Sequence, residues 1–323
     1  MTRTVRRIAS LLIATAAFAA SAQDYPNRPI TLIVPFTAGG PTDTLARIFA
    51  TRMGKTLNQT IVVENVVGAG GVIANNKVMR APADGYMVAI GHVGTHVLAP
   101  AVQGIEADYV NDFDPVAMIA ANPEIVAVHP GVPAKTLKEF VAYVKANPGK
   151  VSYGTGGPGT PSHVMAVDFG ARVGSELNIV HYKGSAPALQ DVIAGHVNST
   201  FDQAATALAQ VKAGRIVALA VTSPTRLTSA PDIPTVDEAG LPGFYMSIWH
   251  ALWVPQGTPS AVVARLNAAA REALADPAVR KQLLDLGQEI PSLDQQTPAA
   301  LRAYHKAETD KWWPIIKAAG IKS

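Results

Sequence analysis

Several residue types that build particular functional sites are absent or scarce in this 323-residue chain. It has no cysteine, which excludes disulfides, a thiolate nucleophile, cysteine-ligated zinc and iron–sulfur clusters. Charged residues make up 16% and aromatic residues 6%, and no stretch combines clustered Lys and Arg with aromatic side chains. This composition excludes a disordered chain and a nucleic-acid-binding surface. With 48% hydrophobic residues, the chain is long enough for one large or two ordinary domains.

A long apolar run lies at the N-terminus. Three arginines precede the apolar segment 8–20, and a small-residue pattern ends at Ala22. The run is too short to cross the ~30 Å hydrocarbon core as a helix, so residues 1–22 are predicted to be a secretory signal peptide cleaved after Ala22. A membrane anchor is the alternative. Without the three arginines, the remaining chain has 24 basic and 24 acidic residues and therefore no net charge.

Short apolar runs alternate with helical patterns from residue 30 onward, joined by Gly and Pro turns. Thr136 and Glu139 have the spacing of a capping box, which predicts that a helix begins there. Strands are predicted at residues 30–35, 61–64, 86–90, 125–128, 151–153, 178–182, 199–201, 217–221 and 248–254. The alternation predicts an α/β protein of two lobes, each a mostly parallel sheet flanked by helices.

The lobe boundaries follow from the position of a proline-rich connection at 223–243. With that connection, the chain crosses between lobes near Asn122–Glu124 and again near Ser247–Trp249. We therefore expect lobe 1 to comprise residues 23–123 plus 248–323, and lobe 2 to comprise residues 124–247. A monomer is expected.

Four glycine-rich turns stand where a strand ends and a helix begins. They span residues 35–43, 68–71, 154–163 and 182–186. Glycine allows the backbone N–H groups of such a turn to point at one place, and a helix N-terminus leaves its first N–H groups free. These turns can therefore bind an anion without a cationic side chain, and only Lys183 brings a positive charge to them. The alternative is that the glycines merely close tight connections.

The motifs of common enzymes are missing. The glycine turns match neither a Walker loop nor the dinucleotide fingerprint, and no nucleophile elbow occurs. His92 and His96 have the spacing of a helical metal site, but Gly91 and Gly94 argue against a helix there. Ser162–His163 are adjacent in sequence and cannot form a nucleophile–base pair by themselves. We therefore expect no cofactor, no metal and no enzymatic activity.

Three side chains near the turns have two interpretations each. Asp202 follows a predicted strand, and it either accepts a hydrogen bond from a ligand in the cleft or has a structural role. Asp43 is interpreted as the acid of a helix first turn rather than as a catalyst. Phe36 lies between a strand and a glycine turn, where its ring either covers an apolar ligand body or packs in the core.

Several segments of the chain have residues in a characteristic combination. They are Tyr25–Ile30, Ile33–Phe36, Gly39–Arg47, Val63–Gly71, Pro82–Tyr86, His181–Ala188 and Pro231–Gly243. In this combination the chain resembles the substrate-binding proteins of tripartite tricarboxylate transporters, also called the Bug family. The resemblance implies a periplasmic, two-lobe Venus-flytrap receptor that captures a small organic carboxylate and delivers it to membrane permease subunits. A sensor kinase stays open as a further partner.

The resemblance also implies a set of ligand contacts in both lobes, in which backbone amides and waters hold one carboxylate. The first-lobe positions are Phe36, Thr37, Ala38, Gly39, Gly40, Asp43, Gly68, Ala69, Gly70, Gly71, Thr95 and His96. The second-lobe positions are Thr155, Gly156, Gly157, Thr160, Ser162, His163, Lys183, Gly184, Ser185, Ala186, Asp202 and Gln203.

Two stretches depart from the family pattern, Val66–Val67 and Gly91–Val93. Both lie near the expected pocket, so the ligand stays open among a dicarboxylate, an aromatic carboxylate and an acidic amino acid. Two functions of other classes are alternatives. An exported hydrolase would use the same cleft for catalysis, and an interaction protein would bind no small ligand at all.

Overall fold

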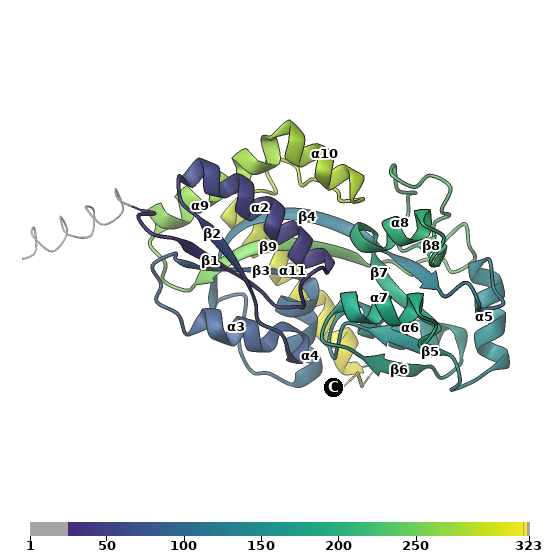
Figure 1. The fold of residues 1–323 in the computed structure, drawn as a ribbon. Coiled ribbons are helices and arrows are strands. Elements are labelled where there is room, and N and C mark those ends of the chain that lie inside the picture. The colour runs from purple at the N-terminus through teal and green to yellow at the C-terminus, as the bar shows by residue number, and fades with distance from the viewer. Residues whose placement is uncertain (1–24, 319, 322–323) are drawn as a thin grey trace, which may run out of the picture.

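The computed structural model describes residues 25–318 and 320–321, so the predicted signal peptide lies outside the described residues. Within this part no helix is long and apolar enough to cross a membrane. The chain forms two α/β units that lie side by side, and one long strand, β4 (Phe113–Val128), runs through both of them (Figure 1).

The first unit combines the N-terminal part of the chain with its C-terminal quarter. Its strands follow the order β2-β1-β3-β9-β4. Its other elements are β1 (Ile30–Val34), α2 (Pro41–Leu57), β2 (Ile61–Asn65), η1 (Ala69–Gly71), α3 (Val72–Met79), β3 (Met87–His92), η2 (Gly94–Leu98), α4 (Ala99–Gln103), β9 (Ser247–Pro255), α9 (Ser260–Ala275), α10 (Pro277–Asp285) and α11 (Pro298–Ala318).

The second unit is built from the middle of the chain. Its strands follow the order β4-β7-β5-β6, and β8 pairs with β4. Its elements besides β4 are α5 (Leu137–Ala146), β5 (Ser152–Thr155), α6 (Pro161–Val173), β6 (Asn178–His181), α7 (Ser185–Ile193), β7 (Ser199–Gln203), α8 (Ala204–Lys212) and β8 (Val217–Val221).

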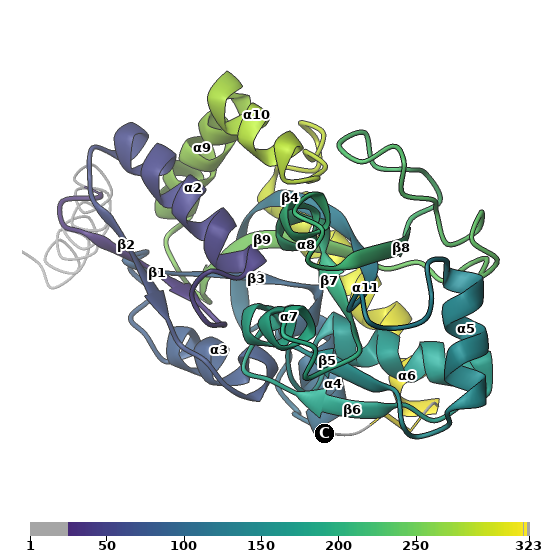
Figure 2. The same ribbon diagram turned by 45° about the vertical axis from the view of Figure 1, so that its right-hand side comes forward.

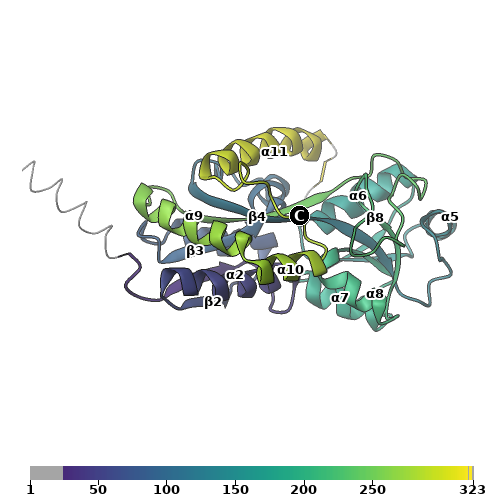
Figure 3. The same cartoon turned by 90° about the horizontal axis from the view of Figure 1, so that it is seen from above.

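Helices cover both faces of the strand layer, which Figure 3 shows edge-on. In the first unit, buried side chains of α2, α9 and α10 pack on one face, and those of α11 pack on the other. In the second unit, α5 and α6 cover one face, and α7 and α8 cover the opposite one. The core under α11 continues into the core under α5 and α6, so the two units share one hydrophobic cluster.

The predicted alternation of strands and helices is confirmed, with one addition. Strands β1, β2 and β3 pair in parallel, as do β5, β6 and β7, but β4 and β9 pair antiparallel with their neighbours. The sheet is therefore mixed rather than mostly parallel. The helix predicted from the capping box also begins as expected, since the Thr136 hydroxyl accepts from the Glu139 amide and the Glu139 carboxylate accepts from the Thr136 amide.

The strand predicted at 125–128 is the last part of the much longer β4. Sequence analysis did not predict a strand at residues 113–124, because Pro115 and Pro123 disfavour a strand there. In the first unit β4 is the last strand of the sheet and pairs with β9. Proline is tolerated there because an edge strand can leave one row of backbone groups unpaired.

The strand pairing changes where β4 passes from one unit to the other. Up to Pro123 it pairs with β9, and from Glu124 onward it pairs with β7. The Thr222 side chain fixes this point, because its hydroxyl accepts from the Glu124 amide at 2.9 Å and lies 3.1 Å from the Met246 carbonyl. The lobe boundaries stay a prediction, which this change of partner supports.

Candidate functional site

The glycine turns of the two units meet at their junction. A Cβ atom placed on Gly70 would lie 2.3 Å from the carbonyl oxygen of Pro158, and one placed on Gly159 would lie 2.4 Å from the Cα of Ala99. No side chain fits at such distances, so glycine is required at both positions. The backbones of the two units are therefore in direct contact here.

A second contact joins the turn before α2 to the turn before α7, which belong to different units (Figure 2). A Cβ placed on Gly40 would lie 3.9 Å from the Cβ of Ala186. A Cβ placed on Gly184 would lie 2.9 Å from Oγ1 of Thr37 and 3.4 Å from the Cβ of Phe36. The structure thus brings the predicted first-lobe and second-lobe turns together.

Four helices begin at this junction without a side-chain cap. Their N-cap residues are Gly40 for α2, Thr160 for α6, Gly184 for α7 and Gln203 for α8, and no side chain of theirs accepts from the helix. Away from the junction, α5 has its capping box and Asp276 caps α10, whereas α9 also lacks a side-chain cap. An uncapped N-terminus carries a partial positive charge and free N–H donors, the combination that holds an anion.

The turn before α6 uses several of its own amides internally. The Gly156 amide donates to Oγ of Ser162 at 3.1 Å, and the Gly159 amide donates to Nδ1 of His163 at 3.0 Å. The Thr160 amide donates to the carbonyl of Gly157. Ser162 and His163 therefore shape this turn, and the turns before α2 and α7 are better placed to offer amides to a ligand.

Asp43 holds the turn before α2 in shape. Its carboxylate accepts from the Gly39 amide at 3.0 Å, from Arg47 at 2.8 Å and from Nδ2 of Asn65 at 3.0 Å. Burial raises the pKa of Asp43, but these hydrogen bonds and the charge of Arg47 outweigh burial, so the pKa lies below its usual value. This engagement matches the interpretation of Asp43 as the acid of a helix first turn.

Phe36 belongs to a buried aromatic group on the first-unit side of the junction. Its ring stacks on His92 at 5.1 Å between centroids, and His92 meets His250 edge-on at 5.2 Å. Oγ1 of Thr42 lies 3.2 Å from Nε2 of His250. Burial lowers the pKa of His92 to about 3 and that of His250 well below its usual value, so both rings are uncharged at neutral pH. Sequence reasoning did not include either histidine in the site.

Thr95 and His96 lie on the opposite face of the first sheet. The His96 ring stacks on Trp253 at 3.7 Å, and its carbonyl oxygen lies 3.0 Å from Nε2 of His305 in α11. Oγ1 of Thr95 lies 2.8 Å from Nδ1 of His96 and accepts from the His92 amide. Both side chains therefore pack against the turn that follows β3. A direct ligand contact of His96 stays a prediction.

Two buried carboxyl groups line the second-unit side. Oδ2 of Asp202 accepts from Thr206 in α8 at 2.6 Å, and burial raises the pKa of Asp202 to about 7. Glu124 lies on the adjoining strand, and burial together with the charge of Asp202 raises its pKa well above the usual value. Sequence reasoning found Asp202 but missed Glu124. The available signal was a charged residue interrupting an apolar strand run.

Other predicted positions have different environments. Oγ1 of Thr37 is buried and has no partner among the described residues. Oγ1 of Thr155 lies 2.8 Å from Nδ1 of His181, so Thr155 is engaged within its own unit. The Lys183 side chain is exposed to solvent. Within the described residues, no three metal-binding side chains are grouped to hold an ion.

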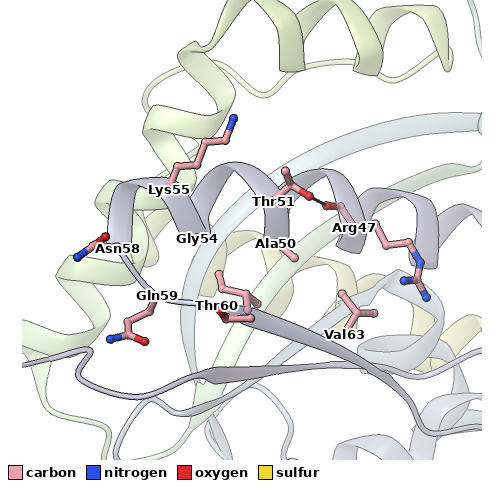
Figure 4. Close-up of a pocket in the computed structure, with 10 residues that line it drawn as sticks. Arg47, Ala50, Thr51, Gly54, Lys55, Asn58, Gln59, Thr60 and Val63 are labelled. Carbon is pink, nitrogen blue, oxygen red and sulfur yellow. Dashed lines mark hydrogen bonds between the residues drawn. The ribbon is translucent and has the colours of Figure 1, made fainter.

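A prominent hollow of the surface lies elsewhere, between α2 and β2 (Figure 4). It measures about 770 Å³ and is lined by polar residues such as Lys55, Asn58 and Gln59. In the described part of the chain, none of its lining residues has a buried polar atom without a partner. The junction between the units is therefore the stronger candidate for the site.

The fold and the site define a class of protein. The structure matches the periplasmic binding protein BugD, with a TM-score of 0.88 and 37% identity over 92% of this chain and 99% of BugD. It also matches MatC from Rhodopseudomonas palustris with bound malate, with a TM-score of 0.87 and 36% identity over 90% of this chain and 100% of MatC. The two-unit α/β architecture is thus the periplasmic-binding-protein fold.

Sequence comparison identifies the family. Residues 45–321 match the model of the tripartite tricarboxylate transporter family receptor. The chain is also 33% identical over 326 residues to BugT of Bordetella pertussis, covering 100% of this chain and 99% of BugT. The chain belongs to the Bug family of tripartite tricarboxylate transporter receptors, which are substrate-binding proteins, and the predicted resemblance is confirmed.

Proposed function

We propose that the protein is a periplasmic receptor that captures a small organic carboxylate between its two units and delivers it to membrane permease subunits. The observation that carries this proposal is the meeting of four uncapped helix N-termini at the junction of the units. A carboxylate placed there accepts hydrogen bonds from backbone amides and interacts favourably with the helix dipoles. No cationic side chain is needed.

The first-unit turns hold one carboxylate in this proposal. The amides offered to the ligand belong to the residues after Phe36, in the turn before α2. Hydrogen bonds of Asp43 and Asn65 fix the shape of this turn. The turn before α7 closes on it from the second unit. Closure follows from contacts that exist only when the units meet, so ligand binding shifts the population toward the closed state. The close contacts of Gly40 with Ala186 and of Gly184 with Thr37 support these predicted positions as ligand contacts.

The distal end of the ligand then lies toward Asp202 and Gln203. MatC, a relative of known structure, binds malate, which supports a dicarboxylate as one candidate. The stacked rings of Phe36 and His92 support an aromatic carboxylate as a second candidate, because they offer a flat apolar surface. An acidic amino acid is the third, and its ammonium group would use the acceptors of the second unit.

A thermal-shift screen of residues 23–323 against mono-, di- and tricarboxylates, aromatic acids and amino acids tests the proposal. The protein is first unfolded and refolded to remove any ligand acquired during purification. A ligand at 100 times its Kd adds about 2.7 kcal/mol to the free energy of unfolding, which raises the Tm by a few degrees. A carboxylate that stabilises the protein and is recovered unchanged supports a receptor. A flat screen contradicts the proposal.

Export is tested separately. The N-terminal leader predicts delivery to the periplasm, and we expect the mature chain to begin at Gln23. Mass spectrometry of the protein recovered from the periplasmic fraction measures this directly. Full-length protein retained in the cytoplasm would contradict it.

A further inference from the structure

A group of buried polar side chains lies where the second sheet meets the first. Glu124 of β4 lies directly opposite Gln203 of β7. Asn122 precedes Glu124 by two residues on the same strand, so the three side chains leave the same face of the sheet. Asp202, next to Gln203, faces the other way. Each of the four is at most 4% exposed.

These side chains have unused hydrogen-bonding atoms. Within the described residues, no partner is present for Oε2 of Glu124, Oε1 of Gln203, Oδ1 of Asp202 or either amide atom of Asn122. Buried polar groups in folded proteins nearly always have a partner, so these atoms need partners that the described residues do not supply, either water or a ligand. Four of these five atoms are oxygens, so when the carboxyls are ionised the group offers mainly acceptors and is satisfied by a hydrogen-bond donor.

The cluster also lacks a positive charge. No Lys or Arg side chain is buried in the described part of the chain, and neither Glu124 nor Asp202 forms an ion pair there. Two buried carboxyl groups on paired strands repel each other when both are ionised. A second carboxylate from a ligand would add to that repulsion, whereas a cation would relieve it.

We propose that Glu124, with Asn122 and Gln203 on the same face of the sheet, binds the ammonium group of the ligand, so that the preferred ligands are amino-substituted carboxylates rather than simple diacids. This inference rests on the proposed function, in which the helix N-termini hold the ligand carboxylate. Backbone N–H donors then bind the carboxylate end of the ligand, and side-chain acceptors bind its ammonium end.

Calorimetric titration with matched pairs of compounds tests the inference. Each pair has one chain length and differs only in its second group, for example 4-aminobutanoate against butanedioate and 5-aminopentanoate against pentanedioate. We expect the amino compound to bind at least ten-fold more tightly at the best length. Diacids preferred at every length overturn this inference and leave the proposed function intact. Failure of every carboxylate to bind overturns the proposed function itself.

The pH dependence of binding distinguishes the two ligand types further. An ammonium group favours an ionised Glu124, whose pKa burial raises well above its usual value, so its affinity should rise with pH, by up to ten-fold per unit, over the interval in which Glu124 ionises. A diacid held by protonated carboxyls would lose affinity over the same interval. Two neighbouring charges affect these pKa values. The charge of Asp202 raises the pKa of Glu124, and the charge of Glu124 raises the pKa of the Tyr153 phenol. An affinity for the amino compound that falls with pH contradicts the inference.

Glu124→Gln removes the charge and keeps the size of the side chain. The backbone at this position is held by Thr222, so we expect the variant to fold. It should bind the amino compound at least ten-fold more weakly and the diacid unchanged or more tightly. The exposed Glu106→Gln is the matched control and should change neither. Asp202→Asn removes a charge on the opposite face of the sheet and should weaken binding of the amino compound less than Glu124→Gln does. Equal weakening of both compounds would indicate a structural role and overturn the inference.

Discussion

The two sides of the junction differ in the titratable groups that they bury, although the first unit also buries the Asp43 carboxyl and the second unit the His163 imidazole. The first unit buries four imidazoles, those of His92, His96, His250 and His305. Burial lowers the pKa of each, so they are uncharged at neutral pH. The second-unit side buries two carboxyl groups whose pKa values burial raises. Desolvation penalises the charged form on both sides. It therefore favours the neutral, deprotonated imidazoles in the first unit and the neutral, protonated carboxyls on the second-unit side.

This difference explains how a ligand can be recognised without a fixed cation. On the first-unit side the buried carboxylate of Asp43 is neutralised by Arg47, and the neighbouring imidazoles carry no charge. The positive potential there comes from helix N-termini. On the other side burial raises the pKa of both carboxyls, and in our proposal a positive group of the ligand favours the ionised form of Glu124. The two sides therefore respond to pH in opposite directions, and each response can be measured separately.

The largest expected effect concerns the second-unit side. The folded-state pKa of Asp202, about 7, lies above its ordinary value of 3.8, so its contribution to stability is complete below pH 4 and is lost as pH rises through 7. Asp202→Asn removes this loss. We expect the ligand-free variant to be more stable than the wild type at pH 8, by about 4 kcal/mol, and little changed near pH 4. Urea unfolding at both pH values measures this, and equal stability at pH 8 would contradict it.

The next effect concerns the first-unit side and has the opposite sign. The pKa of His305 is lowered to about 4 from 6.5, so its contribution to stability is complete above pH 6.5 and is lost as pH falls toward 4. His305→Gln cannot be protonated and should reduce the loss of stability between pH 7 and pH 4 by about 3 kcal/mol. The exposed His196→Gln serves as the control. A variant as acid-sensitive as the wild type would falsify this assignment.

A smaller effect is expected where the two sides touch. Gly40 has an ordinary φ of −80°, so a side chain there meets no backbone strain but extends toward Ala186 of the other unit. Gly40→Val should weaken ligand binding about 100-fold, or about 2.7 kcal/mol, because the added methyl groups keep the units apart. Calorimetric titration with the best carboxylate measures the change.

Gly40→Ala is the graded control for that contact. Its Cβ would lie 3.5 Å from the Thr37 carbonyl and 3.9 Å from Ala186, which is ordinary contact, so only a slight loss of affinity is expected. Both variants should keep the two pH responses described above, since those arise within each unit. Full-affinity binding by Gly40→Val would rule out this contact as part of closure.

Much of the fold was predictable from local pattern. The strand at Ile30 and the helix that follows its glycine turn were predicted because buried strands and helices have different periods of apolar residues. The first half of β4 was not, since Pro115 and Pro123 disfavour a strand unless it lies at the edge of a sheet. Whether β4 is an edge strand depends on which strands pair, and strand pairing joins residues far apart in the chain.

The site divides in the same way. Glycine turns before helices are recognisable in the sequence as short motifs. In the structure, glycines of these turns lie where the two units come into close contact. Glu124 and His250 were missed because each is a single polar residue inside an apolar strand, which by itself signals nothing about a neighbour. Their significance comes from cross-strand partners, Gln203 for Glu124 and His92 for His250.

The sequence by itself predicted a leader, and it determined the order of strands and helices and the position of the glycine turns. Each of these depends on residues within a few positions of one another. Only the tertiary structure decided that Gly70 touches Pro158, that His92 meets His250 and that Glu124 lies beside Gln203. These contacts depend on strand register and on the packing of two units, which join residues more than 75 positions apart.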